Sequence, residues 1–194
     1  MMLHEDIKKT AQLMADFDRP WAFGGGWAID LWLGRQTRTH KDVDLIVWRD
    51  DQRAAYDYLV ARGWTLQQAI DGTLIPWDGS WIALPVHTIW CRHAKHTPDF
   101  IELLFNEHND SDFLFRRDQT IKRALNRAFV NVGSGLRVLA PEIVLLYKAR
   151  DKERSGHAAD FINALPKLQP EQCRWLHNAL NQLHDNHEWT KLLK

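Results

Sequence analysis

Residues 21–48 read WAFGGGWAIDLWLGRQTRTHKDVDLIVW, and this stretch decides the fold. Its first residues, Trp21–Phe23, predict a short strand that runs into the glycines at positions 24–26. The apolar run Trp27–Leu33 predicts a short helix, which ends because the next residue is a glycine. Residues Asp42–Trp48 include β-branched side chains and predict a second strand. The stretch therefore predicts a strand, a glycine turn, a helix and a second strand in that order.

The rest of the chain divides into two regions of different pattern. Between about residues 64 and 139, short apolar runs are separated by turn residues such as Asp71-Gly72, which predicts mainly strands. The C-terminal part predicts helices, and we therefore expect a first domain at 1–138 and a helical domain at 139–194. The expected helices are Leu3–Phe17, a helix through Tyr56 and Leu59 that finishes at Gly63, Pro141–Lys148, Ala158–Leu165 and Glu171–His184.

Composition limits the classes of partner. The chain has 25 Lys and Arg residues and 25 Asp and Glu residues, so its formal net charge is zero. This balance indicates no surface for polyanions, and nucleic acid is an unexpected partner. The N-terminus lacks an apolar signal segment and runs such as Ile143–Tyr147 are too short to cross a bilayer, so we expect a cytoplasmic protein without membrane contact. Either a monomer or a homodimer is compatible with the sequence.

Two acidic residues, Asp42 and Asp44, stand two positions apart on a predicted strand, so their side chains leave the same face with Cα atoms roughly 7 Å apart. Two carboxylates at that separation repel by roughly 2–3 kcal/mol at an effective dielectric near 20. A divalent cation removes the repulsion, and Mg²⁺ is usually bound by one or two carboxylates together with substrate phosphates. The alternative is a half-exposed edge strand with acidic residues that face water.

The three glycines Gly24, Gly25 and Gly26 precede the predicted helix. Glycine lets backbone N–H groups approach an anion closely, and a helix N-terminus favours phosphate. The alternative is a tight turn with no ligand. A phosphate cradle beside a metal site is chemically useful, because a bound cation and backbone N–H groups both stabilise phosphate charge.

These residues resemble the aminoglycoside 2''-adenylyltransferase family, which belongs to the polymerase-β-like nucleotidyltransferase superfamily. The resemblance implies an α+β nucleotidyltransferase fold, a mixed β-sheet flanked by helices, with a C-terminal helical segment. It is carried by Gly24–Asp30, Leu33-Gly34-Arg35, Thr37-Arg38, His40 and Asp42–Leu45, and a second stretch, Leu139–Glu142 with Leu145–Arg150, looks like the helix that opens the C-terminal part of broader relatives.

The resemblance implies Mg²⁺ as the cofactor, held by Asp42 and Asp44, and a third carboxylate on a later strand that would bind metal and act as general base. The best match is Glu102, which lies in the apolar run Asp99–Phe105, and Asp99 is the second candidate. Burial of an unpaired carboxylate is costly, so an acid in this run needs an explanation. The alternative is an edge strand on which Glu102 faces water.

The resemblance also implies that the glycines at 24–26, Arg38, His40 and Lys148 bind the nucleotide. Arg38 either contacts phosphate or forms a salt bridge to Asp42 or Asp30. His40 is more often a structural hydrogen-bonding residue, and a lysine such as Lys148 is more often solvated. We expect Asp30 to brace the glycine turn.

The sequence gives less indication of a role for three other charged residues. Asp160 receives no chemical role. Arg116 and Arg117 are expected to be a solvated surface pair, with phosphate contact as the lesser alternative.

The function implied by the resemblance is transfer of a nucleoside monophosphate, AMP from ATP, to a hydroxyl of a small molecule such as an aminoglycoside or a lincosamide, with release of pyrophosphate. The expected partners are therefore a nucleoside triphosphate and a small-molecule acceptor. Two alternatives stay open: nucleotidylation of tRNA or protein by a toxin-like enzyme, and a catalytically silent nucleotide-binding module. The near balance of acids and bases in 139–194 does not by itself support a polycationic acceptor.

Overall fold

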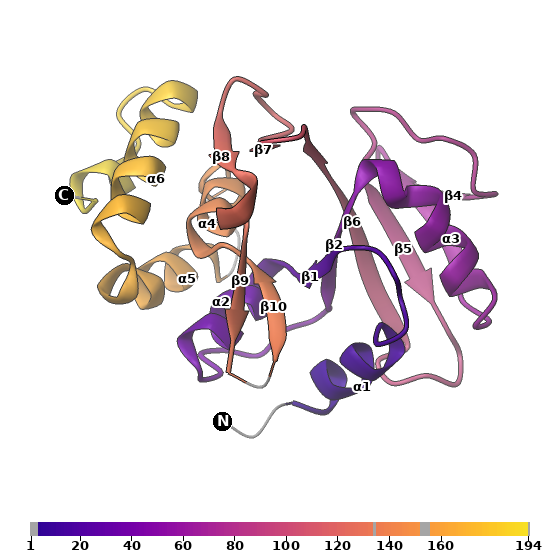
Figure 1. The fold of residues 1–194 in the computed structure, drawn as a ribbon. Coiled ribbons are helices and arrows are strands. Elements are labelled where there is room, and N and C mark those ends of the chain that lie inside the picture. Colours follow the sequence, from indigo (N-terminus) through magenta and orange to yellow (C-terminus); the bar gives the residue numbers. More distant parts are fainter. Residues whose placement is uncertain (1–3, 134, 152–155, 194) are drawn as a thin grey trace.

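The computed structural model describes residues 4–133, 135–151 and 156–193. Helices and strands are interleaved along the chain (Figure 1). The helices are α1 (Glu5–Leu13), α2 (Gly25–Leu33), α3 (Gln52–Val60), α4 (Pro141–Ala149), α5 (His157–Ala164) and α6 (Pro170–Leu183). The strands are β1 (Trp21–Phe23), β2 (Asp44–Trp48), β3 (Thr65–Ile70), β4 (Thr73–Pro76), β5 (Thr88–Arg92), β6 (Phe100–His108), β7 (Asp112–Leu114), β8 (Lys122–Ala124), β9 (Phe129–Val132) and β10 (Leu136–Leu139).

The strands form one mixed sheet in the order β4-β3-β5-β6-β2-β1-β10-β9, and β7 pairs with both β6 and β8. The pairs β2–β6 and β1–β10 are parallel, whereas the other pairs are antiparallel. The predicted α+β class, a mixed sheet flanked by helices with a helical C-terminal segment, is therefore confirmed.

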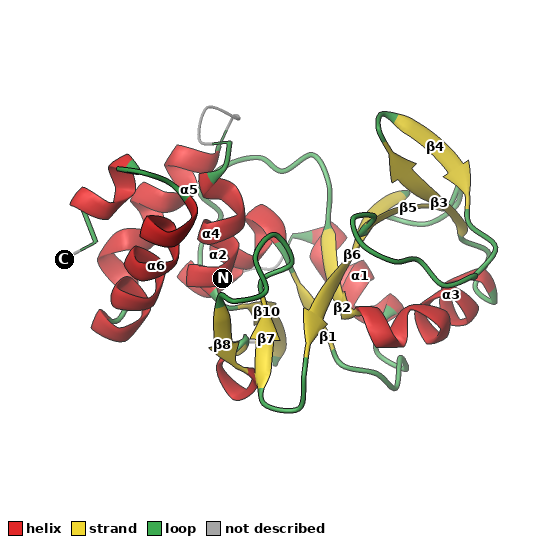
Figure 2. Cartoon of the chain, turned by 90° about the horizontal axis from the view of Figure 1, so that it is seen from above, coloured by secondary structure: helices red, strands yellow, loops and turns green. Residues whose placement is uncertain are grey.

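Helices α4, α5 and α6 gather at one end of the molecule, and the β3–β4 hairpin with α3 lies at the other (Figures 1 and 2). Strand β10 ends at Leu139 and α4 begins at Pro141, which coincides with the change of pattern seen in the sequence. The division into domains at 1–138 and 139–194 stays a prediction. In the part of the chain that the structure describes, no helix combines the length and apolar content needed to cross a bilayer.

Strands β2 and β6 lie at the centre of the sheet. Residues Leu45–Trp48 of β2 are all buried, which is typical of a strand covered on both faces. Strand β6 lies between β2 and β5, so Glu102 stands on an internal strand. The alternative in which Glu102 belongs to an edge strand is wrong, because its neighbours on both sides, Asp44 and Trp90, are paired with it.

Strand β2 begins at Asp44, and the prediction that it begins at Asp42 is wrong. The antiparallel pairing of β1 with β2 reaches only Phe23 opposite Leu45, because the chain then turns into the glycines. Asp42 therefore lies in the loop before the strand.

Candidate active site

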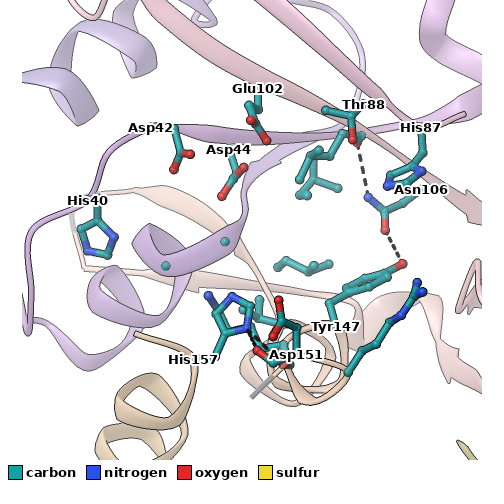
Figure 3. A pocket seen from close by; sticks show the side chains of 18 of the residues that line it. His40, Asp42, Asp44, His87, Thr88, Glu102, Asn106, Tyr147, Asp151 and His157 are labelled. Atoms are coloured by element: carbon teal, nitrogen blue, oxygen red, sulfur yellow. Dashed lines mark hydrogen bonds between the residues drawn. The ribbon is translucent and has the colours of Figure 1, made fainter. Parts of the chain in front are cut away.

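A cavity of about 910 Å³ opens between β2, β6, the start of α2 and α4. The sequence-predicted site residues other than Gly24 all contribute to its wall. They are Gly25, Gly26, Arg38, His40, Asp42, Asp44, Glu102 and Lys148. Figure 3 shows Asp42, Asp44 and Glu102 on one side of this cavity, His87, Asn106 and Tyr147 towards its other end, and Asp151 beside His157.

The register of β2 and β6 explains why two of the carboxylates are neighbours. Asp44 and Glu102 are Cα partners on these parallel strands, so their side chains project from the same face of the sheet. Asp42 reaches the same space from the preceding loop (Figure 3). Among the described residues, no group of three His, Cys, Asp or Glu side chains is close enough to form a preassembled metal cluster. A cation there would need oxygen ligands from elsewhere, as Mg²⁺ commonly takes from phosphate.

The second candidate for the third carboxylate lies apart from this group. Asp99 lines a smaller hollow of about 440 Å³, which Asp42 and Lys41 also border. Asp99 does not line the larger cavity. The structure thus places Glu102, and not Asp99, beside Asp44.

The three glycines of the turn make different contacts, and in two of them these contacts leave no room for a side chain. Gly24 donates its N–H to the carbonyl oxygen of Asp44 at 2.8 Å, and it does not line the cavity. Gly25 has a φ of 54°, and a Cβ atom there would overlap the Asp44 carboxylate. A Cβ on Gly26 would overlap the side chains of Arg38 and His40. The first-turn N–H groups of a helix have no intrahelical acceptors, so those of Gly25 and Gly26 remain available for an anion.

Gly25→Ala is expected to reduce activity severely, because the added methyl group must displace the Asp44 carboxylate in a backbone conformation that already costs about 1–2 kcal/mol for a non-glycine residue. Gly34→Ala is the matched control, since Gly34 has a φ of 76° but a Cβ there meets nothing within 4 Å. Thermal unfolding should show a similar loss for both variants, and turnover should fall only in Gly25→Ala. Equal turnover of the two variants would contradict the close packing of Gly25 on Asp44.

Arg38 and Lys148 meet on one buried acid. Asp160 of α5 is fully buried and accepts two hydrogen bonds from Arg38, each of 2.9 Å, while the Lys148 ammonium lies 2.9 Å from the same carboxylate. The hydrogen bonds to Asp160 raise the pKa of Arg38 above its ordinary value. The predicted alternatives, Arg38 paired with Asp42 or Asp30 and a solvated Lys148, are both wrong, because the buried carboxylate of Asp160 takes both cations.

His40 is held by a second buried acid. Its Nε2 lies 2.6 Å from Asp30, which also accepts hydrogen bonds from the N–H and hydroxyl of Thr37. Burial by itself would raise the pKa of Asp30, but the hydrogen bonds from His40 and Thr37 hold it below its ordinary value. Asp30 therefore braces the loop between α2 and β2. The interpretation of His40 as a hydrogen-bonding residue agrees with this contact, and its ring also lies 4.2 Å from that of Trp27.

Sequence reasoning missed the wall opposite the carboxylates. The hydroxyl of Tyr147 donates to Oδ1 of buried Asn106 at 2.9 Å, and the Arg116 guanidinium lies 4.6 Å from the centroid of the Tyr147 ring. Arg117 donates to the carbonyl oxygen of Tyr147 at 3.0 Å. The prediction of a solvated arginine pair is wrong for Arg116, which is half-buried in the cavity wall. Only the helical position of Tyr147, next to Lys148, could have indicated this wall in advance.

Comparison with known proteins agrees with this geometry. Residues 6–77 match the family described as aminoglycoside-2''-adenylyltransferase. The matched segment contains the glycine turn and both aspartates. Over residues 6–77, which are fewer than half of the chain, the sequence is similar to that family. A comparison of the sequence with curated proteins finds no match.

Solved structures resemble this chain over most of its length. The crystal structure of ANT(2'')-Ia in complex with adenylyl-2''-tobramycin has 17% sequence identity and a TM-score of 0.62, and the match covers 92% of this chain and 97% of that chain. The lincomycin-bound lincosamide antibiotic adenylyltransferase LnuA has 15% identity and a TM-score of 0.58, with 83% and 95% covered. A nucleotidyltransferase-like protein from Paracoccidioides brasiliensis has 19% identity and a TM-score of 0.53, with 97% and 91% covered. The chain therefore has the nucleotidyltransferase fold.

Proposed function

We propose that the protein transfers AMP from ATP to a hydroxyl of a small molecule such as an aminoglycoside or lincosamide antibiotic, and releases pyrophosphate. The observation that carries this proposal is the projection of Asp42, Asp44 and Glu102 into one cavity beside a glycine-rich helix start. The similarity to proteins named as aminoglycoside and lincosamide adenylyltransferases supports both the reaction and the class of acceptor.

In this proposal Mg²⁺ is the cofactor. Asp42 and Asp44 would hold it with Glu102 as a third ligand, and the donor set fits, because carboxylate oxygens are the ligands that Mg²⁺ prefers. Bound there, the ion would neutralise charge on the phosphate oxygens of the nucleotide. The absence of a preassembled cluster of three side chains in the described part of the chain is compatible with a site that the triphosphate completes.

In this proposal, the groups that line the cavity have different roles in the reaction. The acceptor oxygen attacks the α-phosphorus, the bond from that phosphorus to the pyrophosphate oxygen breaks, and Glu102 takes the hydroxyl proton. The N–H groups of Gly25 and Gly26 bind the triphosphate. Arg38 and Lys148, held in place by Asp160, offer two positive charges against one negative charge and so favour phosphate at the cavity wall.

The proposal is tested by incubating the purified protein with Mg²⁺ and each nucleoside triphosphate across a panel of aminoglycosides, lincosamides and tRNA. The expected result is release of pyrophosphate together with a mass gain of one AMP on a small-molecule acceptor. Labelling of tRNA or of protein would instead support a macromolecular substrate. Nucleotide binding without pyrophosphate release on any acceptor would favour a silent nucleotide-binding module.

Glu102→Gln is expected to lower turnover by about 10²–10⁴-fold, the usual contribution of a general base, while nucleotide binding is retained. Glutamine keeps the shape of the side chain but cannot accept the hydroxyl proton. Single-turnover kinetics and a nucleotide-binding titration measure the two effects separately. Glu5→Gln, on the exposed first turn of α1, is the control and should behave as the wild type. Normal turnover of Glu102→Gln would move the base role to Asp99 or another residue.

A further inference from the structure

The cavity wall opposite the carboxylates carries three arginines. Arg116 and Arg117 follow β7, and Arg150 follows α4. The guanidinium carbons of Arg116 and Arg117 lie 4.6 and 5.5 Å from the centroid of the Tyr147 ring, so one aromatic side chain positions both. The bond from Arg117 to the Tyr147 carbonyl fixes the second guanidinium further. The two positive charges are therefore held together by the scaffold.

In the described part of the chain these arginines form no ion pair with an acid, although Asp151 also lines the cavity. Glu107, the carboxylate that favours the charged form of Arg116 after the Tyr147 phenol, lies 2.7 Å from Arg49 and is already paired. Arg116 is half-buried, whereas Arg117 and Arg150 are exposed. Like charges held close together repel one another, and a bound anion would relieve that repulsion.

Burial first, and the neighbouring positive charges second, lower the pKa values of two groups at this wall. Burial, followed by repulsion from Arg116 and Arg150, lowers the pKa of Arg117 to about 10. Burial, followed by repulsion from Arg116, lowers the pKa of His87 to about 4. His87 is therefore neutral at pH 7, and it borders the same wall (Figure 3).

We infer that Arg116, Arg117 and Arg150 form an anion subsite, which binds a phosphate or carboxylate group at the end of the cavity opposite Asp42, Asp44 and Glu102. Arginine suits this role because its planar fork matches the oxygens of both groups. The subsite also indicates the charge of a substrate group in the proposed function, and this second inference rests on that function. Within that function, a negative group on either the nucleotide or the acceptor would lie against this wall.

Inorganic pyrophosphate, titrated in the presence of a chelator and without nucleotide, tests the subsite by calorimetry. The double variant Arg116→Gln with Arg117→Gln should bind pyrophosphate at least about tenfold more weakly than the wild type, since a hydrogen bond to a charged group contributes about 1.5–3 kcal/mol. The matched control removes Arg53 and Arg62, two arginines on and after α3. It should bind pyrophosphate as the wild type does. Equal affinity in all three proteins would overturn the inference.

A second readout locates the anion. In the wild type, saturating pyrophosphate should raise the pKa of His87 above about 4, because a nearby negative charge favours the protonated ring, and NMR titration of the His87 ring measures this. An unchanged His87 pKa would place the ion elsewhere and contradict the subsite. Neither measurement involves turnover, so failure of the proposed nucleotidyl transfer and failure of the subsite are seen separately.

The same variants identify the source of the anion. If the nucleotide supplies it, the arginine double variant loses affinity for ATP but keeps its affinity for adenosine. If the acceptor supplies it, ATP affinity is unchanged while pyrophosphate affinity falls. Both results support the subsite and assign it to different substrates.

Discussion

Asp44→Asn is expected to abolish nucleotidyl transfer, with turnover lower by at least about a thousandfold, because loss of a metal-binding carboxylate removes several kcal/mol of charge stabilisation. Asparagine keeps the volume that packs against Gly25. The carbonyl oxygen of residue 44 still accepts the Gly24 N–H, so β1, β2 and the glycine turn should be retained. The measurement is pyrophosphate release at saturating ATP over a range of Mg²⁺ concentrations.

Two comparisons distinguish loss of the fold from loss of the proposed metal ligand in Asp44→Asn. Thermal unfolding of Asp44→Asn should match that of the wild type within about 0.5 kcal/mol, the range of substitutions that disturb no packing. Asp16→Asn, at an exposed position after α1, removes the same charge and should leave turnover unchanged. Undiminished turnover of Asp44→Asn would remove Asp44 from the proposed metal site.

Arg123→Met is expected to destabilise the protein by about 3–5 kcal/mol, because removal of one partner leaves a buried charge uncompensated. Arg123 of β8 is 7% exposed and donates two hydrogen bonds to Glu142, which is 1% exposed at the start of α4. It also donates to Glu171 of α6. One guanidinium therefore joins the sheet to two helices of the C-terminal segment, and urea unfolding at pH 7 measures what it contributes.

Arg127→Met is the matched control. Arg127 pairs with Glu171 at 2.9 Å, but its side chain is 56% exposed, and exposed pairs contribute at most about 1 kcal/mol. If Arg123→Met and Arg127→Met lose the same free energy of unfolding, the buried pair with Glu142 is not a major contributor.

The loss caused by Arg123→Met should shrink on acidification. Hydrogen bonding to Arg123 lowers the pKa of Glu171 to about 2, so its stabilisation is fully present above the ordinary carboxylate range and disappears as the pH falls towards 2. Burial raises the pKa of Glu142, so acid also neutralises the carboxylate that the variant leaves without a partner. Both effects make the difference between variant and wild type smaller at pH 3.5 than at pH 7.

Local sequence patterns predicted the elements around the site well, and long-range pairing explains where they failed. The strand and helix within 21–33 depend on neighbours in sequence, and the structure confirms both, although the helix begins at Gly25 and not at the predicted Trp27. The first residue of β2 depends on where its partner β1 ends. The sequence of residues 42–44 alone does not predict that position. The internal place of Glu102 depends on β5 and β2, which pair with β6 from distant parts of the chain.

Contacts between charged residues that are far apart in the sequence were also not predicted. The glycines and the two aspartates were found because they lie close together in sequence. Asp160 received no role, since Arg38 is 122 residues away along the chain and nothing in the sequence brings the two together. Arg116 and Arg117 looked like a surface pair for the same reason, because Tyr147 approaches them only after folding.

The position of Asp160 limits how chains of this kind can be recombined. Its partners come from the loop after α2 and from α4, while the acid itself is on α5. A hybrid that joins residues 1–138 to the tail of a relative would inherit Arg38 without a counter-charge, unless the donor tail brings an acid to the same place. A C-terminal segment that replaces residues 139–194 must therefore carry an acid at the position of Asp160.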